Sequence, residues 1–247
     1  MIFLANETTK DATVSANSVD IQYPVSNVLD SRLTRLYKTD SSTTAEIVFD
    51  AGSAVTVDSI AIANHNISSG VSTLKVQGNA TNSWATPSID ETLTYSSGVI
   101  TKTFTGGSYR YWRVYIIDAG NSDGYISIGR IFLADSFTAP DISPTFGHTR
   151  KSSSVKTQSI GGQSYQDTRY FASLVSVKWP AVTATEKSNL ITQFETIDIG
   201  SPFFVTFDES NISIGTLYVT IDQDSLNFNL LANPKYWEAA LSLLEEK

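Results

Sequence analysis

The sequence contains no cysteine and only two histidines, and these shortages exclude several kinds of site. Without cysteine no disulfide can form, so the chain is not one of the small secreted scaffolds that disulfides hold together. His65 and His148 lie far apart in the sequence. A His-based zinc site, a cysteine nucleophile and a HExxH zinc helix therefore all lack the residues they need.

Long apolar runs and an excess of basic residues are also absent. No stretch approaches the ~20 apolar residues of a membrane helix, and the start, MIFLANETTK, has no basic region and is too short for a signal peptide. The 247 residues carry a net charge of −8, which disfavours nucleic acid. We therefore expect a soluble protein without membrane insertion, and without an ordinary secretion signal if it leaves its cell of origin.

Strand-forming residues dominate what is present. Apolar residues make up 41% of the chain, and Thr, Ser, Ile and Val crowd most segments. Short strand patterns separated by Gly, Ser and Asn turns recur between residues 45 and 133. Within residues 110–117, Trp112, Val114 and Ile116 alternate with Tyr111, Arg113 and Tyr115. These patterns predict a jelly-roll β-sandwich over residues 1–137.

Two local features are predicted within this first domain. Residues 93–95 and 99–101 form a hairpin closed by Ser96-Ser97-Gly98. The apolar alternation shifts at Asp58-Ser59, which predicts a change of register within one stretch of strand.

The second half has a different pattern. Residues 136–146 carry two prolines and little periodicity, and we place the interdomain linker at 138–147. A long hairpin is expected at 156–173, with its tip at Ile160-Gly161-Gly162-Gln163, and a last strand from Trp237 to Leu244. The second domain, residues 148–247, is thus predicted to be a β-sandwich.

One helix is expected to flank this second sandwich. Thr183 and Glu186 form a capping box, which satisfies amide donors at a helix start. Leu190, Phe194 and Ile197 then recur at helical spacing, and Gly200 and Pro202 end the pattern. The helix is predicted at 184–197, and its apolar stripe is interpreted as core.

The first domain resembles the galactose-binding-like, or discoidin-type, family over roughly residues 15–135. The matching segments are SNVLD at 26–30, DAG at 50–52, SIAIA at 59–63, LKVQG at 74–78, YRYWRV at 109–114 and ISIGRIFL at 126–133. The family often has Trp where this chain has Tyr37, and Leu where it has Ala51. The variant at 128–133 resembles the versions of this module that are carried on tail proteins of tailed bacteriophages.

The second domain is similar to the tail-tube-type fold shared by phage tube, distal tail and hub proteins. The hairpin, the helix and the last strand come in the corresponding order. This resemblance implies a non-enzymatic distal-tail or minor tail protein of a long-tailed phage, located at the virion tail tip after assembly in the host cytoplasm. It also implies a ring of identical copies, a hexamer, that contacts tube, hub and tape-measure proteins and, through the first domain, a host surface glycan.

Candidate glycan-binding residues are Tyr37, Trp84, Arg32 and Arg35, because the family places their loops at one end of the sandwich. Sugar binding commonly needs an aromatic face together with planar polar groups. The alternatives are that Trp84 is a core aromatic and that the two arginines make subunit contacts.

Galactose-binding-like modules often hold calcium through loop oxygens, which makes Asn27 and Asp30 candidate ligands. The commoner role of such residues is to cap a turn, and this reading is preferred. No cofactor is expected otherwise.

A small basic group, Arg150, Lys151 and Lys156, lies beside the linker. The default interpretation is that these side chains lie on a solvated loop. In a ring, this basic group would contact an acidic surface of the neighbouring copy and help to fix how the two copies align.

No catalytic residues are predicted. Paired carboxylates would suffice for a glycosidase, but Asp222 with Asp224 and Glu245 with Glu246 lie near strand ends, where solvation explains them. Two other functions remain open: a stand-alone carbohydrate-binding protein, and a depolymerase that cleaves glycosides.

Overall fold

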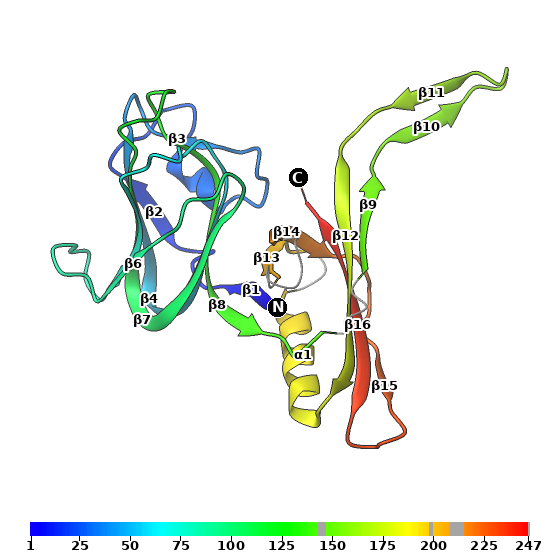
Figure 1. The fold of residues 1–247 in the computed structure, drawn as a ribbon. Helices are drawn as coiled ribbons and strands as arrows, with labels where there is room; N and C mark the ends of the chain where they lie inside the picture. The colour runs from blue at the N-terminus through cyan, green and yellow to red at the C-terminus, as the bar shows by residue number, and fades with distance from the viewer. Residues whose placement is uncertain (143–146, 198–199, 208–214, 247) are drawn as a thin grey trace. The chain divides into compact units, whose positions relative to one another are not determined.

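The structure is a computed structural model of the chain and describes residues 1–142, 147–197, 200–207 and 215–246 (Figure 1). It is mainly β, with a single α-helix in these ranges, so the predicted fold class is confirmed. Two compact units are present. The first unit comprises Ile2–Thr138 and Phe204–Thr216, and the second unit comprises Met1, Ala139–Phe203 and Leu217–Lys247.

The first unit is an antiparallel β-structure around one core. Its elements are β1 (Ile2–Glu7), β2 (Thr13–Ala16), the 3₁₀ helix η1 (Val25–Leu29), β3 (Tyr37–Lys38), β4 (Thr44–His65), β5 (Thr73–Asn79), β6 (Ile89–Thr92), β7 (Ile100–Ile117) and β8 (Ser127–Thr138). Strands neighbour one another in the order β6-β5-β7-β4-β8-β1, while β2 pairs with β4 and β3 with β8. The predicted alternation on β7 is confirmed, because Trp112, Val114 and Ile116 are fully buried.

The local predictions for this unit have different outcomes. The register change is confirmed, since the pairing of β4 with β7 shifts between Val57 and Ser59. The hairpin over 93–101 is wrong, because β6 ends at Thr92 and pairs with β5, whereas β7 begins at Ile100 and pairs with β4 and β5. Ile100 is fully buried opposite Ile62, so burial in the wider sheet overrides the local turn signal.

A strand from much later in the chain completes the first unit. In β13 (Phe203–Thr206), Phe204, Val205 and Thr206 pair antiparallel with Leu4, Phe3 and Ile2 of β1. The Phe204 ring is fully buried and meets the Phe132 ring edge to face, with 5.5 Å between the ring centroids. A contiguous segment 1–137 therefore lacks one strand of this compact unit.

The second unit consists of strands and one α-helix. Its elements are β9 (Gly147–Ser152), β10 (Val155–Gln158), β11 (Ser164–Asp167), β12 (Phe171–Val182), α1 (Ala184–Ile197), β15 (Phe228–Leu230), β16 (Trp237–Glu245) and all but the first residue of β14 (Thr216–Ile221). Strand β16 pairs with β12, β14 and β15, and β12 also pairs with β9. Its core includes the fully buried Trp179, Val175 and Leu243.

Helix α1 spans Ala184–Ile197, as the sequence predicts, and the capping box forms at its start. The Glu186 carboxylate accepts from the Thr183 amide at 2.7 Å, and the Glu186 amide donates to the Thr183 hydroxyl at 3.3 Å. Leu190 and Ile197 are buried, as expected for a stripe that faces the core. The Lys187 ammonium lies 4.8 Å from the centre of the Trp237 ring, which brings the start of the helix to β16.

A buried ion pair lies in the first unit between β1 and β8. Arg130, 5% exposed, donates to Glu7 Oε2 at 2.6 Å and to the Val28 carbonyl at 3.1 Å. The second carboxylate oxygen of Glu7 is buried without a hydrogen-bond partner among the described residues. Burial therefore raises the pKa of Glu7 to about 7, although Arg130 acts in the opposite direction.

Replacing Phe204 by alanine should destabilise the first unit, because it removes a fully buried ring from the β1–β13 pairing. The expected loss in unfolding free energy is about 3–5 kcal/mol, measured by urea denaturation followed by circular dichroism. Leu230→Ala is the control, since Leu230 is 58% exposed and its loss should be small. Equal losses in the two variants would contradict the buried pairing.

The Glu7 carboxylate should make stability depend on pH. The folded chain binds this proton more tightly than the unfolded chain, so the unfolding free energy should fall as pH rises from about 4.5 to about 7 and then level off. The decline is on the order of 3 kcal/mol, and Glu7→Gln should remove it. The measurement is the difference between wild type and variant at each pH, which cancels other groups such as His65, whose pKa burial lowers. Parallel pH profiles would refute this assignment.

Candidate functional site

The candidate site of the second unit is an extended hairpin arm, which we define as residues 153–170. Strands β9 and β12 pair from Ser152–Phe171 to Gly147–Ser176, and beyond them β10 and β11 pair as a separate two-stranded ribbon (Figure 1). The Ser159 amide donates to the Gln163 carbonyl at 2.8 Å, and Gly162 has a φ of +84°. The hairpin and its tip therefore form where the sequence predicts them, and every residue of β10 and β11 is exposed.

The arm has two chemically different faces. Opposed residues of an antiparallel pair point to the same side, and the register pairs Val155 with Asp167 and Thr157 with Tyr165. The other face carries only polar side chains, namely Lys156, Gln158, Ser164 and Gln166. The first face thus combines the apolar Val155 and Tyr165 with Thr157 and Asp167, whereas the second is wholly polar. The described part of the chain covers neither face.

Large apolar side chains gather on and beside the arm. Among the described residues, nine such side chains are exposed, and five of them fall between 155 and 171. They are Val155, Ile160, Tyr165, Tyr170 and Phe171. An isolated two-stranded hairpin is marginally stable in water, and contiguous exposed apolar surface indicates a contact with another molecule. The arm is therefore suited to bind another protein chain.

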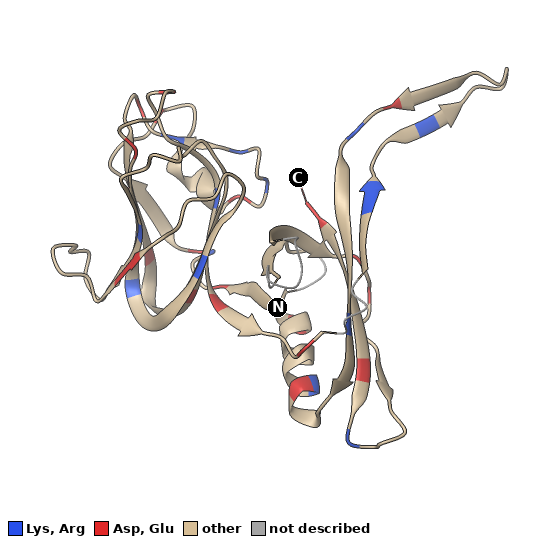
Figure 2. Cartoon of the chain, in the orientation of Figure 1, with Lys and Arg blue, Asp and Glu red and all other residues tan. Residues whose placement is uncertain are grey.

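The structure separates the three residues of the predicted basic group. Arg150 and Lys151 lie on β9, where Arg150 donates to Ser173 Oγ at 3.1 Å and Lys151 is 4.0 Å from Asp222. Lys156 lies on β10, on the polar face of the arm, and makes no ion pair with any residue that the structure describes. The basic segments on β9 and β10 follow one another along the hairpin (Figure 2).

Tyr37 occupies a structural position in the first unit. It is fully buried, and its hydroxyl donates to the Ser18 carbonyl at 2.7 Å. Burial raises the pKa of this hydroxyl. The ring offers no face to solvent, so it is not available to stack on a sugar.

Asp30 organises the loop that carries the two predicted arginines. Its carboxylate accepts from Arg32 Nε at 3.0 Å and Nη2 at 2.9 Å, and it lies 3.3 Å from Arg35 Nη1. The hydrogen bond from Arg32 lowers the pKa of Asp30 to about 2. Asn27 donates to the Leu36 carbonyl at 2.8 Å, and its own carbonyl accepts from the Asp30 amide at 3.0 Å. Both residues thus hold the turn, and a calcium ion at Asp30 would have to displace two guanidinium groups.

Trp84 lies elsewhere, on the loop between β5 and β6. The guanidinium carbon of Arg113 is 4.7 Å from the centre of the Trp84 ring and 4.8 Å from that of Tyr115. Neither Arg113 nor Tyr115 is among the predicted site residues, although the alternation on β7 placed them on one face. Four predicted glycan-binding residues are therefore distributed over three positions: a buried ring, an ion-paired loop and a stacked indole.

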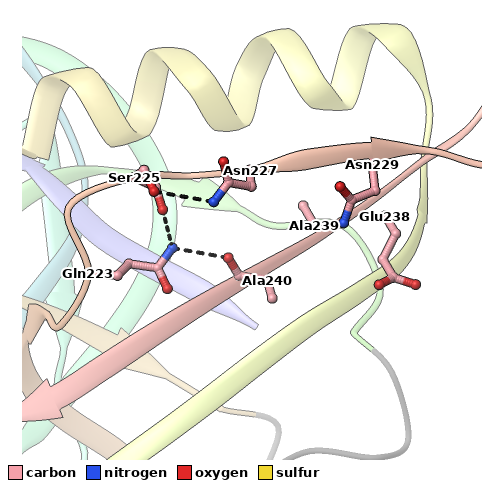
Figure 3. A pocket seen from close by; sticks show the side chains of 7 residues that line it. All are labelled: Gln223, Ser225, Asn227, Asn229, Glu238, Ala239 and Ala240. Carbon is pink, nitrogen blue, oxygen red and sulfur yellow. Dashed lines mark hydrogen bonds between the residues drawn. The ribbon is translucent and has the colours of Figure 1, made fainter.

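A polar hollow of about 250 Å³ lies in the second unit (Figure 3). It is lined by Gln223, Ser225, Asn227, Asn229, Glu238, Ala239 and Ala240. The Gln223 amide donates to the carbonyls of Ser225 at 2.6 Å and Ala240 at 3.2 Å, and Glu238 pairs with Lys178 at 3.1 Å. The polar groups of Gln223 and Glu238 are therefore already engaged within the chain.

Neither a metal cluster nor a membrane span is found in the part of the chain that the structure describes. No three His, Asp or Glu side chains there are grouped as potential metal ligands. No helix within those ranges combines the length and apolarity needed to cross a bilayer.

No protein-family model matches this sequence, and no curated protein matches it. Among solved structures, a family 32 carbohydrate-binding module from C. perfringens NanJ in complex with galactose is 20% identical, covers 55% of this chain and 100% of its own, and has a TM-score of 0.44. A Streptococcus pneumoniae fucose-binding module is 14% identical, with 53% and 95% covered and a TM-score of 0.44. At TM-scores below 0.5, this likeness does not assign a ligand.

The loop that carries Arg32 and Arg35 packs closely on β8, and this contact is testable. A methyl group added at Gly129 would lie 2.2 Å from the Leu33 carbonyl oxygen, which also accepts from Asn64 Nδ2 at 2.6 Å. Gly129→Ala should lower the unfolding free energy by about 1–3 kcal/mol, measured by thermal and urea unfolding. Gly120→Ala is the matched control, because open space surrounds that position. A loss no larger than the control's would show that the loop is not anchored there.

Proposed function

We propose that this protein is a non-enzymatic structural component of a long-tailed phage tail tip, a distal-tail or minor tail protein. Its second unit assembles copies of the chain into a ring, which is sixfold by the resemblance, and its first unit contacts neighbouring tail proteins or a surface glycan. The single observation that carries the proposal is the uncovered hairpin arm, with its exposed apolar side chains.

The arm and the adjacent strand edge favour assembly with other copies of the chain. Strand β9 pairs with β12 on one side, and no described residue pairs with its other side. Unpaired strand edges bind other strands unless they are covered. When one surface of a protein binds a different surface of the next copy, the same contact can repeat from copy to copy. If the rotation between copies closes, the result is a ring. A ring would cover both the arm and this edge.

The proposed location is the virion tail tip, after assembly in the host cytoplasm. The proposed partners are further copies of the chain and the tube, hub and tape-measure proteins. The net charge of −8 agrees with partners other than nucleic acid. The proposal requires no cofactor, and calcium has no assigned role in it.

A second candidate function is that of a stand-alone carbohydrate-binding protein. The observation that favours it is the stacked indole of Trp84 with Arg113 and Tyr115 on the outer face of the first unit. The similar solved structures include modules in complex with galactose and with chitotriose. In this reading the second unit is an accessory domain and the chain does not form a ring.

Assembly is tested on the full chain by size-exclusion chromatography with light scattering and by negative-stain imaging. Wild type should form a ring whose mass does not change with concentration. The double variant Val155→Asp and Tyr165→Asp should be monomeric, because it replaces the two apolar side chains on one face of the arm by charged ones. Ile21→Asp is the control, since Ile21 is 95% exposed in the first unit and should leave assembly intact.

Several results would contradict the proposal. A wild-type monomer at every concentration, combined with glycan affinity, would support the stand-alone binding protein. Loss of assembly in Ile21→Asp, or its retention in the arm variant, would place the interface elsewhere. Release of reducing ends from capsule or lipopolysaccharide by the purified chain would identify a depolymerase instead.

A further inference from the structure

The outer face of β4, β5 and β7 in the first unit carries a second ordered surface, which we call the platform. It consists of Tyr111, Arg113, Tyr115, Gln77 and Trp84. The two tyrosines and the indole are half-buried, while Arg113 is 8% and Gln77 5% exposed. The intervening residues of the same strands face the core. The platform is therefore fixed by the packing beneath it.

The register of the strands arranges this surface in rows. Tyr115 lies opposite Glu46 on β4 and Lys75 on β5. Two residues earlier on β7, Arg113 lies opposite Val48 and Gln77, and Gln77 opposite Asp90 on β6. Tyr111 lies opposite Asp50 and Asn79. Polar and aromatic side chains thus occupy neighbouring positions over four strands.

Arg113 holds the rings of the platform and is not itself free to bind a ligand. Its Nε donates to Gln77 Oε1 at 2.8 Å, and its Nη1 donates to Glu46 Oε2 at 2.7 Å. The Trp84 and Tyr115 rings pack on its guanidinium at 4.7 and 4.8 Å. A guanidinium with its donors engaged and rings on its plane is rigid. The rings are therefore ordered before any ligand binds.

The loop that carries Trp84 is also held in place. Trp84 Nε1 donates to Asn82 Oδ1 at 2.9 Å. Asn79 Nδ2 donates to the Ser83 carbonyl at 2.6 Å, which ties the loop to the end of β5. One side of the indole meets Arg113, and the half-buried ring keeps part of its surface in contact with solvent.

The charged side chains of the platform and of the positions beside it form ion pairs within the chain. Arg113 pairs with Glu46 at 2.7 Å and Lys75 with Asp90 at 2.9 Å. At the third row, Arg110 pairs with Asp50 at 2.7 Å, and its guanidinium lies 4.9 Å from the Tyr111 ring. The surface is therefore rich in hydrogen-bonding groups but has little net charge.

From this geometry we infer that the platform binds a neutral oligosaccharide. Ring faces pack against the apolar faces of pyranose sugars, and carboxylate and amide oxygens accept hydrogen bonds from hydroxyl groups. An anionic ligand would need an unpaired cation, and the arginines and the lysine of this surface are all paired. Tyr111 and Tyr115 are four residues apart on one strand, about 14 Å, so the surface suits several sugar units.

This inference rests on the proposed function only in assigning glycan contact to the first unit, and it does not require a ring. The probes are maltotetraose, cellotetraose, tetra-N-acetylchitotetraose and an array of neutral and acidic oligosaccharides. Binding to the full chain is measured by calorimetry on the first three and by fluorescence on the array. Tyr111→Ala and Trp84→Ala should each weaken binding about tenfold or more, with unchanged circular dichroism.

Two controls separate the platform from other surfaces. Tyr236→Ala removes a tyrosine that is 36% exposed in the second unit and should leave affinity unchanged. The double variant Arg32→Ala and Arg35→Ala alters the Asp30 loop and should also leave it unchanged. Affinity should vary little with salt concentration, because the ions of the platform are already paired.

The inference is overturned if no array member or tetrasaccharide binds, if only acidic members bind with a steep salt dependence, or if the loop variant abolishes binding and the platform variants do not. The last result would move the glycan site and keep the proposed function. Ring assembly is measured in parallel on the same samples. Assembly without saccharide binding refutes the platform alone, and saccharide binding by a monomer refutes the ring alone.

Discussion

The two-residue repeat of β7 is the constraint on which the first unit depends. It sends Trp112, Val114 and Ile116 into the core and leaves Arg113 and Tyr115 on the outer face. Strands β4 and β5 pair with its two edges, so a slip of one residue would expose the core and bury the platform together. The energy that fixes the core therefore also fixes which side chains of β7 lie on the outer face.

The exposed side chains of the two units differ in whether they have partners within the chain. On the first unit, the charges of the platform are paired within the chain, and the Trp84 and Tyr115 rings pack on the guanidinium of Arg113. On the second unit, the arm keeps Val155 and Tyr165 uncovered on a ribbon only two strands wide. The first surface is complete in one copy of the chain and suits a small ligand. The arm would gain most of its stability from a partner, which is why assembly is the function proposed for it.

Local sequence patterns predicted the secondary-structure elements better than the candidate site residues. The capping box located α1, and the glycines after Ile160 located the tip of the arm, because caps and turns are decided by a few neighbouring residues. Among the candidate site residues, Tyr37 is fully buried and Asp30 is held by two arginines. The same side chains suit a core, a turn or a ligand, so residue type alone did not choose between these roles.

The sequence by itself determined that this chain is mainly β, where buried and exposed residues alternate along its strands, and where its helix begins. Periodicity and capping depend on residues that lie only a few positions apart in the sequence. Only the tertiary structure decided that β13 pairs with β1, that β6 pairs with β5 and not β7, and that Trp84 stacks on Arg113. Each of these contacts joins segments that are separated in the sequence, and no local pattern links them. Their energy comes from burial across the whole sheet, which no short window of sequence contains.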